Sequence, residues 1–129
     1  MSRLRRARPI RRVLKAGGVV GYLGEFEQLI LFAVLQLDRD AHGVRIRETI
    51  EERTGRVVSS GAICTTLGRL EERSLVTSRV GDPTPGRAGR PRKFYSVEPA
   101  GARALMDPYS TIEAMAGGLI PTLADLAES

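Results

Sequence analysis

A strongly basic loop between two short alternating segments constrains the fold of this chain most. Residues 75–80 and 92–97 alternate apolar with polar side chains, which is typical of half-buried strands. Between them, the run GRAGRPRKFY over residues 86–95 joins two glycines and a proline to four cationic side chains. Open glycine backbone lets such side chains approach a polyanion closely. The pattern predicts a hairpin whose loop, residues 81–93, lies along phosphates, and the alternative is an ordinary solvated loop. The cations are Arg87, Arg90, Arg92 and Lys93.

Three amphipathic segments precede this hairpin. Apolar side chains recur at steps of three and four over residues 25–37, and a second segment runs from residue 44 until Gly55, a residue type that commonly ends helices. Ser59 is well placed to cap a third helix over residues 59–73. Its predicted buried stripe is Ile63, Leu67 and Leu70. The predicted fold class is mainly α with a small β-hairpin, as in a winged helix-turn-helix domain.

The last thirty residues carry a seam of apolar side chains at alternating steps of four and three, which is typical of paired helices. Pro99 predicts a helix start, and Asp107 followed by Pro108 repeats that signal. Gly117, Gly118 and Pro121 interrupt the seam and are expected to weaken or kink the helix. We favour a C-terminal dimerisation helix, and hence a homodimer, over a tail packed on its own domain. The seam is Leu105, Tyr109, Ile112, Ala116, Leu119, Leu123 and Leu126.

Positive charge is unevenly distributed along the 129 residues, whose formal net charge is +5. Residues 1–15 hold seven of the twenty basic residues and no acidic one, which leaves 13 basic residues against 15 acidic ones in the rest. We predict a basic flexible arm over residues 1–20, a winged domain over 21–98 and a helical dimerisation segment over 99–129. The arm either adds nonspecific attraction to DNA or is a disordered leader.

Several function classes are disfavoured by the residue inventory. Cys64 and His42 are the only cysteine and the only histidine, so an intramolecular disulfide and a multi-cysteine metal site lack members. The two residues could in principle form a nucleophile–base pair, but nothing near them in the sequence supplies an orienting group or a glycine-rich oxyanion turn. We therefore predict no enzyme activity, no metal and no cofactor. Glu25 and Glu27 interrupt the first apolar stretch, so the sequence predicts neither a secretory segment nor a membrane contact. The expected location is the cytoplasm.

The third predicted helix turns a face of small side chains away from its buried stripe. At about 100° per residue, Gly61, Thr65, Gly68 and Glu72 lie opposite that stripe, flanked by Cys64 and Arg69. Small side chains let a helix approach base edges, where Thr65 is able to contact a thymine methyl group and Arg69 a guanine or a phosphate. The alternative for Arg69 is a solvated surface cation.

Four segments in order resemble the PadR family of bacterial transcriptional regulators over about residues 23–105. They read LGEFEQLILFAVLQL, HGVRIRETIEERTG, VSSGAICTTLGRLEERSLV and GRPRKFYSVEPAG. The resemblance implies a winged helix-turn-helix protein that dimerises through a C-terminal helix, usually represses a promoter, and often responds to a small-molecule effector. It also implies a nucleoid-associated protein of the bacterial cytoplasm. By position it assigns Ser60, Thr65, Thr66 and Arg69 to the recognition helix.

Together these patterns predict a sequence-specific regulator of transcription that binds double-stranded promoter DNA, and the resemblance implies that it is a repressor. Helix 59–73 would enter the major groove, and the wing over residues 81–93 would lie on the backbone. The alternative is a winged-helix module for protein–protein interaction without operator recognition, which Cys64, Gly68 and Glu72 on the exposed face suggest. The predicted DNA-binding residues are Ser59, Ser60, Gly61, Cys64, Thr65, Thr66, Arg69, Arg87, Arg90, Arg92 and Lys93.

Overall fold

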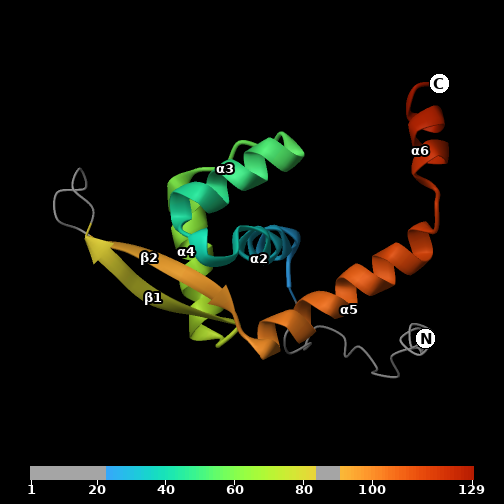
Figure 1. Cartoon of the computed structure of the whole chain (residues 1–129). Helices are drawn as coiled ribbons and strands as arrows, with labels where there is room; N and C mark the ends of the chain where they lie inside the picture. Colours follow the sequence, from blue (N-terminus) through green and yellow to red (C-terminus); the bar gives the residue numbers. More distant parts are fainter. Residues whose placement is uncertain (1–22, 84–90) are drawn as a thin grey trace.

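The computed structural model describes residues 23–83 and 91–129, which form helices and one β-hairpin around a single hydrophobic core. Helices α2, α3 and α4 form a bundle, the hairpin projects from one side of it, and α5 leads away from the other side (Figure 1). The predicted basic arm and the loop cations Arg87 and Arg90 lie outside the described residues. The mainly helical fold class with a small hairpin is confirmed.

Helix α2 (Glu25–Leu37) and helix α3 (Gly43–Thr54) match the predicted segments. The Gly24 N–H donates to the Glu27 carboxylate at 2.9 Å, which holds the start of α2. A short 3-10 helix, η1 (Asp38–Asp40), joins the two helices. Helix α3 ends as expected at Gly55, whose φ of 79° lies in the left-handed region that favours glycine.

Helix α4 (Ser60–Glu72) begins where the sequence predicted a cap. The Ser59 hydroxyl oxygen accepts a hydrogen bond from the Ala62 N–H at 3.0 Å. Ile63, Leu67 and Leu70 are at most 1% exposed, so the predicted inner stripe is confirmed. Burial of these three side chains fixes which face of α4 remains open to solvent.

Strands β1 (Val76–Pro83) and β2 (Pro91–Val97) pair antiparallel, and both differ slightly from the predicted bounds. The ladder runs without interruption from Val76↔Val97 to Val80↔Lys93 and shifts register before Pro83. Alternation is weak near the loop, which explains why the sequence placed the end of β1 too early. The Tyr95 N–H donates to the Ala41 carbonyl at 2.8 Å, so β2 is attached to the helical bundle as well as to β1.

Helix α5 (Pro99–Ala116) passes through Pro108 without a break, so the predicted second helix start at Asp107 is wrong. The helix continues through Pro108 because side chains before and after the proline pack against the rest of the domain. Leu105 is 4% exposed and belongs to the core, while the Tyr109 ring contacts the Phe32 ring edge-on at 5.5 Å. A proline removes one backbone hydrogen bond, and these contacts hold the helix across the gap.

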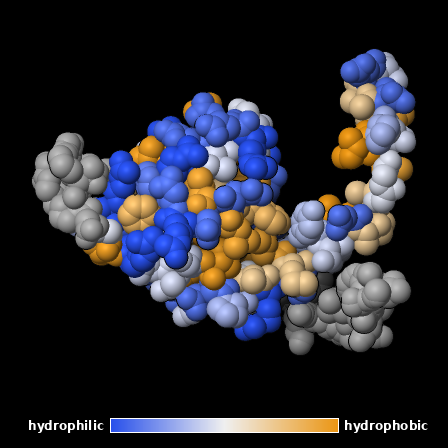
Figure 2. Space-filling view, in the orientation of Figure 1, coloured by the Kyte–Doolittle hydropathy of each residue, from blue (hydrophilic) through white to orange (hydrophobic). Residues whose placement is uncertain are grey.

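The chain does break after Ala116, where the sequence places two glycines. Gly117 and Gly118 have φ values of 29° and 80°, and a separate helix α6 (Ile120–Ala127) follows. Every residue of α6 is exposed, and the helix stands away from the bundle at the far end of α5 (Figure 1). Figure 2 shows hydrophobic residues gathered over α2 and toward α5, and again on α6.

Candidate nucleic-acid interface

The exposed face of α4, called here the recognition face, consists of Gly61, Thr65, Gly68 and Glu72, all of which are exposed. A methyl group added to Gly61 or Gly68 would meet no atom within 4 Å beyond the neighbouring backbone of its own helix, so both glycines leave open space in front of the helix. Three other predicted residues, Ser59, Ser60 and Arg69, are exposed around this face, and Cys64 is an exposed free thiol beside it.

Thr66 is the one predicted member of this helix that the structure turns inward. Its exposed fraction is 3%, and it lies on the same side as Ile63 and Leu70. A side chain in that position contacts the core and not a ligand outside the helix, so we leave Thr66 out of the proposed interface. The position is consistent with the angular step of about 100° per residue that exposes Thr65.

The two described cations of the wing, Arg92 and Lys93, occupy different environments. Lys93 is exposed, and its Nζ lies 3.7 Å from the Glu71 carboxylate at the end of α4. Glu71 also accepts a hydrogen bond of 2.7 Å from the Ser78 hydroxyl. Arg92 is half-buried, and its Nη1 lies 3.4 Å from His42 Nε2. Lys93 therefore has an acidic neighbour, whereas Arg92 extends toward the start of α3.

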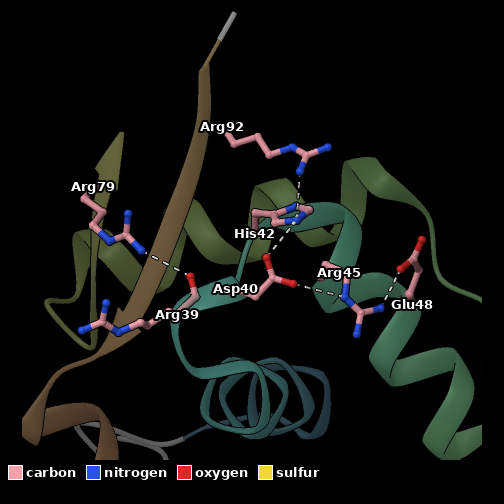
Figure 3. A network of polar contacts seen from close by, with 7 residues as sticks. All are labelled: Arg39, Asp40, His42, Arg45, Glu48, Arg79 and Arg92. Carbon is pink, nitrogen blue, oxygen red and sulfur yellow. Dashed lines mark hydrogen bonds and ion pairs between the residues drawn. The ribbon is translucent and has the colours of Figure 1, made fainter. Parts of the chain in front are cut away.

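A network of polar side chains continues from this contact along the start of α3 (Figure 3). His42 Nε2 lies 3.7 Å from Asp40 Oδ1, and the other oxygen of Asp40 lies 3.5 Å from Arg45 Nε. Arg45 donates to Glu48 at 2.7 Å, and this hydrogen bond is the main reason why the pKa of Arg45 is raised above its usual value. The network links the start of β2 to the first two turns of α3.

A second cluster fixes the outer side of the hairpin. The Arg79 guanidinium lies over the Phe94 ring, 4.7 Å from its centroid. It also donates to the Arg39 carbonyl at 3.2 Å (Figure 3). The Phe94 ring also contacts the buried His42 ring edge-on at 5.4 Å. These contacts and the Tyr95 N–H bond set the angle between the hairpin and the helices.

A hollow of about 270 Å³, called here the wing groove, lies between the start of α3, α4 and β2. It brings together four of the predicted residues: Ser60 and Cys64 from α4, and Arg92 and Lys93 from β2. Thr65 and Arg69 do not line it. The groove therefore borders one edge of the recognition face. Its full lining is His42, Gly43, Val44, Ser60, Ile63, Cys64, Leu67, Arg92, Lys93 and Tyr95.

Sequence reasoning missed the part of this groove that the start of α3 supplies. His42 is 5% exposed, and Gly43 and Val44 follow it as the first residues of α3. The available signal was a histidine and a glycine directly before a helical pattern, a position where backbone N–H groups are left without partners in the helix. Tyr95 also lines the groove, and burial raises the pKa of its hydroxyl above the usual value.

The predicted dimerisation seam is mostly open in a single chain. Leu105 is the exception, because it is 4% exposed in the core of its own chain, and we leave it out of the proposed dimer face. Tyr109 is half exposed and borders a second hollow of about 310 Å³ between α2 and α3. Ala116 is half-buried. The exposed members are Tyr109, Ile112, Leu119, Leu123 and Leu126.

Residues 23–83 and 91–129 contain no group of three or more His, Cys, Asp or Glu side chains arranged to hold a metal ion. Within the same residues, each helix is too short or too polar to cross a lipid bilayer.

Comparison with solved structures shows the same fold in two transcription regulators and in part of a protein solved with DNA. A PadR family transcription regulator from Clostridium difficile aligns with a TM-score of 0.60 and 18% identity, over 76% of this chain and 98% of that chain. A PadR-like transcriptional regulator from Bacillus cereus aligns with a TM-score of 0.55 and 20% identity, over 81% and 92%. The Orc1 protein of Aeropyrum pernix, solved in complex with DNA, aligns with a TM-score of 0.53 and 25% identity, over 69% of this chain and 25% of that chain.

Comparison with curated proteins gave no match. The model of the transcriptional regulator PadR-like family matches residues 31–107, a range that runs from α2 to the middle of α5 and includes both α4 and the hairpin. That range is more than half of the chain, and its fold is the one seen in the solved PadR regulators. The chain therefore belongs to the PadR-like family of DNA-binding transcriptional regulators.

Proposed function

We propose that this chain is a sequence-specific repressor that binds promoter DNA as a homodimer, with α4 in the major groove and the hairpin on the adjacent backbone. The observation that carries the proposal is the pairing of two surfaces. The recognition face of α4 is exposed and built from small side chains, and the wing groove beside it is lined by Arg92 and Lys93. A winged-helix protein binds DNA with one helix in the major groove and with cationic side chains of the wing beside the adjacent phosphates.

The composition of the recognition face supports close approach to base pairs. Gly61 and Gly68 carry no side chain, so the helix axis is able to lie deeper in the major groove than a helix with long side chains would. Thr65, between them, is placed to contact a thymine methyl group. Arg69 lies at the edge of the face away from the wing groove and is placed for a guanine or a phosphate.

Homodimer formation is supported by the exposed apolar side chains of α5 and α6. Ile112, Leu123 and Leu126 are more than half exposed in one chain, which is an unusual density of open apolar surface at one end of a molecule. Two copies joined there would present two α4 helices to DNA, as in dimeric helix-turn-helix proteins. Release of the DNA by a small-molecule effector stays a prediction.

The test is a selection of duplexes from a random library by the purified full-length chain, followed by fluorescence anisotropy. We expect enrichment of a two-fold symmetric sequence, bound about a thousandfold or more tightly than a scrambled duplex at physiological salt. A reporter driven by a promoter containing that sequence should lose output when the protein is present. Recovery of unselected sequences, with equal affinity for selected and scrambled duplexes, would refute the proposal.

A further inference from the structure

The wing groove contains a guanidinium that is not directly paired with any carboxylate of the described residues. Arg92 forms no ion pair with a carboxylate in the described residues, and its one hydrogen-bonding neighbour there is His42 at 3.4 Å. Its Nε is buried without a hydrogen-bond partner in the same part of the chain. By contrast, the Lys93 ammonium faces Glu71 at 3.7 Å. Arg92 is therefore the cation of the groove with unused capacity to bind an anion.

The start of α3, which also lines the groove, adds to this positive potential. Gly43 and Val44, the first two residues of α3, line the groove, and the first turn of α3 contains no acidic residue. His42 precedes the helix and does not cap it through its side chain. The first N–H groups of a helix have no intrahelical acceptor, and together with the helix dipole they favour an anion. This contribution supports the Arg92 site and would not define a site alone.

The other residues that line the groove limit which ligands fit between Arg92 and the start of α3. Ser60, an exposed hydroxyl at the start of α4, contributes a further hydrogen-bond donor, while Val44, Ile63 and Leu67 form apolar surface. The groove shares Ser60 and Cys64 with the border of the recognition face. An anion held here would thus lie directly beside a helix placed in the major groove, which is where the DNA backbone runs.

We propose that the wing groove binds one backbone phosphate of the DNA, between the Arg92 guanidinium, the first N–H groups of α3 and the Ser60 hydroxyl. This inference rests on the proposed function and goes beyond it, because it assigns His42, Gly43 and Val44 to the interface and moves the main wing contact from the loop to the start of β2. Because α3 and β2 both contact this phosphate, the phosphate fixes the angle at which α4 enters the major groove of the DNA.

The first test changes Gly43, which tolerates a side chain because a methyl group there would meet nothing within 4 Å. Gly43→Glu places a negative charge at the first helical position, where it favours the folded helix but repels a phosphate. We expect an unchanged or raised melting temperature and a loss of DNA affinity of about tenfold or more relative to Gly43→Gln, which adds similar bulk without charge. Equal affinities of the two variants for the selected duplex would overturn the inference.

The second test maps the phosphate itself. Single methylphosphonate substitutions, which remove one backbone charge, are scanned along the selected duplex. At one position in each half-site we expect the wild-type protein to lose about tenfold in affinity, and Arg92→Gln to show little further loss at that position. Arg92→Gln should also lower the slope of log Kd against log salt by about one per half-site, whereas Arg103→Gln, on α5, should not. Arg92→Lys should restore part of the affinity.

The outcomes separate this inference from the proposed function. If the wild-type chain selects no duplex, the proposed function itself fails. If it binds selectively but no methylphosphonate position is coupled to Arg92, the phosphate site alone is wrong. A flat scan combined with an Arg92-dependent rise in melting temperature on addition of inorganic phosphate would show that the groove takes a free anion, and would also overturn the inference.

Discussion

Two neighbouring threonines of α4 show how one residue step separates a functional position from a structural one. Thr65 is exposed on the recognition face, whereas Thr66 is 3% exposed and faces the core. The difference follows from the rotation of about 100° per residue in a helix whose inner side is fixed by Ile63 and Leu70. Family resemblance by position placed both residues at the DNA, but only the helical geometry tells them apart.

Replacement of each threonine by alanine should therefore change a different property, sequence preference for Thr65 and stability for Thr66. Thr65→Ala should leave the free energy of unfolding within about 0.5 kcal/mol of wild type and change the order of preference among duplexes. Thr66→Ala should cost about 1 kcal/mol of stability, because it removes buried atoms, and should leave sequence preference unchanged. Urea denaturation measures the first quantity and anisotropy with a panel of duplexes the second. A stability loss confined to Thr65→Ala would contradict the assignment of the two faces.

The elements themselves were largely predictable because their signals are local. Periodic apolar residues, the Ser59 cap and Gly55 placed α2, α3 and α4 within about one residue of their observed bounds. Pro108 misled the prediction because a helix start and a tolerated internal proline look alike in sequence. Only the packing of Leu105 in the core and of Tyr109 on Phe32 decides between them, and that packing is tertiary.

The junction between the hairpin and α5 depends on a glycine that sequence reasoning did not single out. A side chain at Gly101 would collide with the backbone carbonyl of Leu75, which already accepts a hydrogen bond of 2.9 Å from the Glu98 N–H. Backbone atoms cannot rotate aside as a flexible side chain does. The close approach of α5 to the first residues of the hairpin therefore requires glycine at this position.

Gly101→Ala should destabilise the fold by about 1–3 kcal/mol, because the added methyl group forces α5 away from Leu75. The matched change Gly68→Ala, in open space on α4, should instead raise stability by up to about 1 kcal/mol through better helix propensity. Thermal unfolding of both variants followed by circular dichroism provides the measurement. Equal stabilities of the two variants would mean that α5 does not pack on the hairpin as described.

At the scale of the whole molecule, the groove and the dimer face arise from residues that are distant in sequence. The wing groove brings His42, Ser60 and Arg92 together because β2 is attached to the bundle through the Tyr95 N–H. No local sequence pattern predicts that hydrogen bond. The sequence predicted four wing cations as a group, and the two that lie in the described residues, Arg92 and Lys93, both line the groove. It could not indicate which of them would point inward, because that depends on the angle between the hairpin and α3.

The exposed apolar side of α5 and α6 leads to the last prediction, which concerns assembly. Ile112 is 66% exposed and Leu123 56%, and burial of each such side chain between two chains would contribute about 1.5–3 kcal/mol. Ile112→Glu should therefore convert a dimer to a monomer in analytical ultracentrifugation and weaken binding to a two-site duplex more than to a single half-site. Ala114→Glu is the control, since Ala114 is also exposed but lies about 200° around α5 from Ile112. It should remain dimeric. Two outcomes would show that α5 and α6 do not join two copies: a wild-type chain that is monomeric at micromolar concentration, or two variants whose assemblies have the same mass in solution. The pairing of two recognition helices would then need another interface.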